Sequence, residues 1–253
     1  MILDLGSPFP CPARQEGSEV AGRTGRVAPF WLSVPLCLLV MGAANVATNR
    51  LSAANVAIGV TFTAALAGIA RASGLRAKDV GLGRSTWMQG WRWGGACVGI
   101  ALVGYGIALL LPQIRSLVAG SPEASWPHTL VTVLLVIPLA TVIPEELAFR
   151  GVLLALLDSR YARNVAAAVS SILFGLWHTL PSLSGGPANR AADQIVGAGT
   201  GGMVLRALGT IVFTAGAGVL FCALRRRSDS LLAPMLAHWS VNGLGTIFVR
   251  LAG

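Results

Sequence analysis

Residues 127–157 form the longest apolar run of the chain and read PHTLVTVLLVIPLATVIPEELAFRGVLLALL. An α-helix needs about 20 apolar residues to cross the hydrocarbon core of a bilayer, and this run is longer. It nevertheless carries Glu145, Glu146 and Arg150. Each charge at bilayer depth costs about 2.5–3.5 kcal/mol on insertion scales. The run therefore predicts a membrane-spanning helix that holds a functional site.

The composition of the whole chain agrees with a membrane protein. Of its 253 residues 54% are hydrophobic and 11% are charged, and the mean hydropathy is +0.70. Soluble domains carry about 25% charged residues, so a water-exposed surface is excluded. The net charge is +9, but the basic residues lie mostly between apolar runs. Membrane lipids and topology explain this charge better than nucleic acid, and no nucleic-acid partner is expected.

Seven apolar runs predict an all-α fold, a polytopic transmembrane helix bundle of about seven spans. The third run holds Gly95 and Gly99 at GxxxG spacing, which permits a close helix approach. The runs are residues 29–48, 51–70, 94–112, 127–157, 163–180, 203–224 and 230–249.

The basic residues also predict a topology. Alternate connections carry 13 and 5 Lys and Arg residues, which favours a cytoplasmic N-terminus in a multi-pass protein of the cell membrane. Residues 1–27 are polar and rich in Pro, Gly and Arg, so we expect a disordered cytoplasmic tail. The connection 181–202 is rich in Gly and Pro and is either a flexible loop or a lid or re-entrant segment over a site.

Two carboxylates in the fourth run differ in their surroundings. Glu146 and Arg150 are four residues apart, so they share a helix face and can form an ion pair. Glu145 points about 100° away and has no local partner. An unpaired carboxylate of this kind suits a general base or acid. Pro144, directly before the glutamates, should loosen the helix there.

Two further spans carry polar pairs at helical spacing. Phe174 and His178 share one face of the fifth span, and His238 and Asn242 share one face of the seventh. Two polar side chains that point the same way suit an oxyanion clamp. A membrane histidine can also serve only as a hydrogen bonder between helices.

The order EExxxR, FxxxH and HxxxN on successive helices resembles the CPBP family of intramembrane proteases. This family includes the type II CAAX prenyl endopeptidases and bacterial bacteriocin-processing and immunity proteins. The segment RSDSLLAP at 227–234 is similar to the family's usual approach to its last conserved helix. The resemblance implies a CAAX-protease-like catalytic core in residues 125–250, preceded by N-terminal transmembrane helices in 28–124.

The resemblance also implies roles for the six residues. Peptide bonds of membrane-associated peptide or protein substrates would be hydrolysed by a water that Glu145 and His178 activate. His238 and Asn242 would hold the oxyanion. The pair Glu146 and Arg150 would orient the site.

Whether the site binds a metal ion remains open at this point. Glu145, His178 and His238 could ligate zinc with an open water position, whereas a glutamate-dependent, metal-free mechanism uses the same residues. Two other classes compete with the peptidase. One is a non-catalytic immunity or scaffold protein of the same fold. The other is a proton-coupled transporter that uses Glu145 and His178 as a relay.

The expected depths of the two histidines in the membrane disagree with each other. His238 is expected about 12 Å from the start of its span, and His178 about 22 Å from the cytoplasmic start of its own. We expect the site in the cytoplasmic half of the membrane. The conflict would then mean that the boundary of the fifth span is displaced.

Overall fold

The computed structural model of the chain describes residues 27–118, 125–183, 192, 193, 195–197 and 199–252. Within these residues all regular secondary structure is helical, as the apolar runs predict. Residues 1–26 of the expected tail and residues 184–191, 194 and 198 of the 181–202 connection lie outside this description. The main helices are α1 (Phe30–Arg50), α2 (Asn55–Ala72), α3 (Trp87–Leu110), α4 (Pro112–Val118), α5 (Trp126–Val131), α6 (Ile143–Glu146), α7 (Leu154–Asp158), α8 (Arg163–Trp177), α9 (Thr179–Ser182), α11 (Thr200–Ser228), α12 (Leu232–Trp239) and α13 (Gly245–Ala252).

Six helices of the described chain are long and apolar enough to cross a membrane. They correspond to the first six predicted spans, and α5, α6 and α7 belong to one of them, Trp126–Asp158. The seventh predicted span is also helical, since α12 continues into α13 through a wide turn at Ser240–Leu244. His238, Ser240 and Asn242 make this segment more polar than the other six.

The helix Trp126–Asp158 mixes α and π geometry. Wider π turns occupy Thr132–Val136, Pro138–Val142 and Leu147–Leu153, on both sides of α6. Proline has no N–H to donate, so Pro138 and Pro144 each leave a carbonyl in the preceding turn without its usual partner. The loosening expected near Pro144 thus takes the form of π turns, which are frequent at functional sites.

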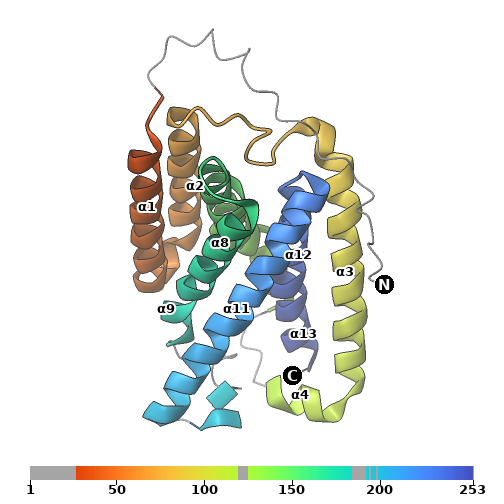
Figure 1. The fold of residues 1–253 in the computed structure, drawn as a ribbon. Coiled ribbons are helices and arrows are strands. Elements are labelled where there is room, and N and C mark those ends of the chain that lie inside the picture. The colour runs from red at the N-terminus through yellow and green to blue at the C-terminus, as the bar shows by residue number, and fades with distance from the viewer. Residues whose placement is uncertain (1–26, 119–124, 184–191, 194, 198, 253) are drawn as a thin grey trace, which may run out of the picture.

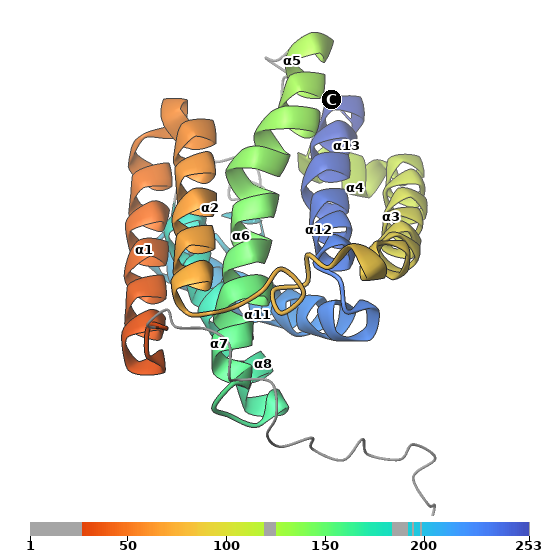
Figure 2. The same cartoon turned by 90° about the horizontal axis from the view of Figure 1, so that it is seen from above.

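The helices cross one another at large angles. Helices α1 and α2 lie side by side on one flank, α3 lies on the other, and α11 runs obliquely between them (Figure 1). Seen from above, α3 is nearly end-on, whereas the helix that contains α6 runs lengthwise (Figure 2). Residues at different distances from their helix ends can therefore meet in the centre of the bundle.

Glycines permit several close helix contacts, two of which concern the helices around the glutamates. A Cβ atom at Gly90 would lie 2.5 Å from Ser230 Oγ, and one at Gly94 would lie 2.7 Å from Leu236 Cβ, so α3 packs tightly on α12. A Cβ atom at Gly95 or Gly99 would meet nothing within 4 Å, so these two glycines do not form the contact predicted for them. The third span does use a pair of glycines four residues apart, but the packed pair is Gly90 and Gly94.

The second close contact brings α2 to the helix that carries the glutamates. A Cβ atom at Gly59 would lie only 2.3 Å from the carbonyl oxygen of Leu139. Only glycine fits so near a backbone. This approach carries Phe62 of α2 to the ring of Trp177, with 6.0 Å between ring centroids and 16° between planes.

The connections rich in basic residues gather at one end of the bundle. Arg226 donates to the Asp158 carboxylate and to the Arg163 carbonyl, both at 2.8 Å. Arg225 donates to the Asp79 carbonyl at 3.0 Å. Helix alternation therefore agrees with the charge count, while the orientation of this end in a membrane stays a prediction.

Candidate active site

The three motifs meet at the carboxylate of Glu145. Its Oε2 atom lies 4.0 Å from Nε2 of His178 and 4.0 Å from Nε2 of His238. Glu145, His178 and Asn242 line a pocket of about 360 Å³. Side chains that are 33 to 97 positions apart in the sequence are thus brought to one place by the helix crossings.

The expected boundary error of the fifth span is wrong. Helix α8 begins at Arg163, where the span was expected to start, and His178 directly follows its last residue, Trp177. The histidines meet because the helices cross obliquely, as Figures 1 and 2 show for α8, α11 and the helix through α6. Distances along the helix axes therefore do not measure depth in this bundle.

The hydrogen bonds fix which nitrogen of each histidine faces Glu145. Nδ1 of His178 lies 2.8 Å from the Phe174 carbonyl oxygen, which can only accept, so this nitrogen carries the proton and donates. Nδ1 of His238 lies 2.8 Å from Oε1 of Glu146 and donates to that carboxylate. Nε2 of each ring therefore faces Oε2 of Glu145, where it accepts a hydrogen bond if the ring is neutral and donates one if the ring is protonated.

Glu146 and Arg150 form the expected ion pair behind the site. Arg150 Nη1 lies 3.0 Å from Glu146 Oε1, and both side chains are fully buried. The same oxygen accepts from His238, so one carboxylate atom joins the guanidinium to the imidazole. The pair does not line the pocket, and its contact with the site runs through His238.

Aromatic rings enclose this charged group. The Arg150 guanidinium lies 4.0 Å from the ring centroid of Phe174 and 4.9 Å from that of Phe221. Phe221 also stacks on His238, with 5.4 Å between centroids and 28° between planes. Stacked rings attract the cation and exclude water, which strengthens the ion pair.

Two residues that the motifs do not include contact the site. The indole Nε1 of Trp177 donates to Oε1 of Glu145 at 3.0 Å. Asn45 of α1, which is buried, donates from Nδ2 to the Trp177 carbonyl at 2.7 Å. Two features of the sequence could have pointed to these residues: Trp177 stands next to a membrane histidine, and Asn45 is a polar residue inside an apolar span. Neither feature indicates which residue the side chain would bind.

The pocket extends toward the end where α1 finishes and α2 begins. Thr48, Asn49 and Asn55 from that end line it, together with Pro181 after α8. The basic connections lie at the opposite end of these helices. The site was expected in the cytoplasmic half, but the pocket opens at the end opposite to the basic connections. His178 lies at that end because it follows the last residue of α8, which begins at the basic end.

The side chains suggested for zinc do not fit one as arranged. Among the described residues no group of three or more His, Cys, Asp or Glu side chains is arranged to hold a metal ion. Zinc ligands at about 2.0–2.2 Å in a tetrahedron lie about 3.4 Å from one another. Both nitrogen–oxygen distances here are 4.0 Å.

The connection after the pocket is described only in part. Arg206 of α11 donates from Nε to the Ser182 carbonyl at 3.0 Å and pairs with Asp193, which holds the start of α11 against α9. Residues 184–191, 194 and 198 lie outside the description, so the choice between loop and lid stays open.

Comparisons with known proteins agree with the motifs. Residues 127–244 match the family described as type II CAAX prenyl endopeptidase Rce1-like. No curated protein and no solved structure was found to match the chain. The matched segment contains all six motif residues and Trp177, whereas Asn45 lies outside it. The match supports a membrane protease of the CAAX type in general terms. Through its segment 127–244, this chain is similar to the Rce1-like family of type II CAAX prenyl endopeptidases, which supports a membrane protease of the CPBP family.

Proposed function

We propose that this protein is an intramembrane endopeptidase that hydrolyses peptide bonds of membrane-associated substrates with a water activated by Glu145. The observation that carries the proposal is the position of the Glu145 carboxylate. Its Oε2 atom is buried, has no hydrogen-bond partner among the described residues and faces two imidazole nitrogens. A buried acceptor without a partner indicates a missing water or substrate group.

The distances suit a bound water. A water about 2.8 Å from each of two acceptors fits between atoms that are 4.0 Å apart. It would donate one hydrogen to Oε2 of Glu145 and the other to Nε2 of His178, which is an acceptor in the neutral ring. This leaves a lone pair of the water oxygen free to attack a carbonyl carbon in the pocket.

The chemical step balances with these groups. Glu145 takes a proton from the water as its oxygen bonds to the scissile carbon, and the carbonyl oxygen becomes an oxyanion. Asn242 and a protonated His238 would donate hydrogen bonds to that oxyanion. Glu145 then returns the proton to the amide nitrogen as the carbon–nitrogen bond breaks.

The buried pair behind the site supports this assignment. Glu146 accepts from Nδ1 of His238, so a protonated His238 directs its second N–H toward Glu145 and the pocket. Hydrogen bonds inside a dry site are stronger than in water, and the aromatic rings exclude water from this side. Glu146 and Arg150 thus orient His238 rather than touch the substrate.

The test uses purified full-length protein in lipid nanodiscs and a library of fluorogenic peptides. We expect wild type to cleave at least one peptide, and Glu145→Gln and His178→Ala to lower kcat by 10²-fold or more, the range of a lost catalytic base. Asp158→Asn is the matched control, because it removes a carboxylate at the end of the same helix that pairs with Arg226.

Two outcomes would contradict the peptidase. Unchanged cleavage by folded Glu145→Gln protein would remove Glu145 from the mechanism. A proton flux in liposomes that depends on Glu145, with no cleavage by wild type, would favour the transporter instead.

A further inference from the structure

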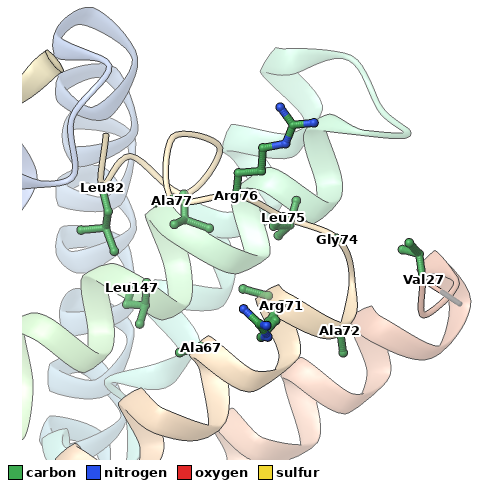
Figure 3. Close-up of a pocket in the computed structure, with 12 residues that line it drawn as sticks. Val27, Ala67, Arg71, Ala72, Gly74, Leu75, Arg76, Ala77, Leu82 and Leu147 are labelled. Carbon is green, nitrogen blue, oxygen red and sulfur yellow. The ribbon is translucent and has the colours of Figure 1, made fainter. Parts of the chain in front are cut away.

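A second cavity lies at the end of the bundle that holds the basic connections. It has a volume of about 560 Å³ and lies between α2, the connection after it and Leu147 (Figure 3). Its walls are mostly apolar, with Ala67 and Ala70 from α2, Val80 from the connection and Leu147. Ligand pockets usually have volumes of about 300–1,000 Å³.

Two arginines complete this cavity. Figure 3 shows Arg71 near its centre and Arg76 on the connection above it, and both side chains are exposed. No hydrogen bond from the Arg71 guanidinium is made to any described residue. The one acidic residue in 27–118 is Asp79, and its Oδ2 already accepts from the backbone N–H of Arg76.

Arg71 is not needed to cap its helix. A basic residue in the last turn commonly binds the free carbonyls there. In α2 the carbonyls of Ile69, Ala70 and Arg71 accept from backbone N–H groups that follow, and that of Ala72 accepts from Ala28. The guanidinium therefore remains available for an acceptor that enters the cavity.

We propose that this cavity binds the headgroup and upper acyl chain of an anionic phospholipid. Arginine binds phosphate through two parallel N–H donors, and the apolar walls suit a hydrocarbon chain. The cavity lies at the ends of two spanning helices, where lipid headgroups are found. Leu147 follows Glu146 directly, so the lipid would pack between α2 and the helix that carries the glutamates.

The test titrates the purified full chain in neutral detergent with phosphatidylglycerol or phosphatidylcholine, read by native mass spectrometry and by Tm. We expect phosphatidylglycerol alone to bind and to raise Tm. Arg71→Gln should weaken its binding about tenfold, the effect of losing hydrogen bonds to a charged group. Ala67→Phe, which fills the cavity and keeps both arginines, should weaken binding as well.

Arg92→Gln is the matched control, because it removes one exposed positive charge from α3, away from the cavity. Equal weakening by Arg92→Gln and Arg71→Gln would overturn the site in favour of general surface charge. Inorganic phosphate that raises Tm and displaces the lipid at equal concentration would make this a site for free anions. Unchanged binding in Ala67→Phe would exclude the cavity.

Discussion

The indole Nε1 of Trp177 donates a hydrogen bond to Oε1 of Glu145 at 3.0 Å. This bond occupies one carboxylate oxygen and leaves Oε2 to face both histidines. Trp177 itself is held by stacking on Phe62 and by the bond from Asn45 to its carbonyl. Helices α1 and α2, which precede the matched segment, therefore help to position the proposed base.

Replacing the indole tests this positioning. We expect Trp177→Phe to lower kcat about tenfold with little change in KM, because a hydrogen bond to a charged group is worth about 1.5–3 kcal/mol. Steady-state kinetics on a cleaved peptide checks this. The control is Trp239→Phe, which removes an indole bond of the same length to the Val133 carbonyl. Equal losses of kcat in the two variants would mean that Trp177 contributes only through packing.

Variants of the buried pair of Glu146 and Arg150 should affect stability and activity differently. Arg150→Leu should destabilise the protein by about 3–5 kcal/mol, because it leaves a buried carboxylate without its cation. Glu146→Leu combined with Arg150→Leu should regain most of this stability, yet cleavage should stay low because His238 loses its acceptor. Thermal unfolding and kinetics measure the two effects. Full activity in the double variant would contradict the role of Glu146.

The close approach of α2 depends on Gly59. Gly59→Ala should lower stability by about 1–3 kcal/mol and impair cleavage, since its Cβ meets the Leu139 carbonyl and pushes α2 from the site. Gly68→Ala is the control on the same helix, where nothing lies within 4 Å. That variant should be neutral or slightly more stable, because alanine favours a helix. Similar Tm losses in both would refute the contact.

A metal requirement can be measured directly. The donor atoms around Glu145 are farther apart than zinc ligands are, so we expect cleavage to survive extensive chelation. Elemental analysis of the active protein should find zinc well below one ion per chain. Loss of activity on chelation that zinc reverses would require the two histidines to move closer to Glu145.

The amino-acid sequence was enough to predict the helices and the local pairing of side chains within them. Apolar runs long enough to cross a bilayer must form helices there, since only internal hydrogen bonds can satisfy the backbone. Glu146 and Arg150 pair because a helix sets residues four apart on one face, and the structure contains this pair. These relationships are local, so spacing along the chain was enough to predict them.

Tertiary structure alone decided how these elements meet. The large crossing angles bring His178 to the same carboxylate as His238, although their distances along their own helices disagree. Packing selects Gly90 and Gly94 over Gly95 and Gly99, and it brings Asn45 and Trp177 to Glu145. The rotation and tilt of a helix depend on how its side chains pack against those of distant segments. They cannot be predicted from the pattern of residues within one helix.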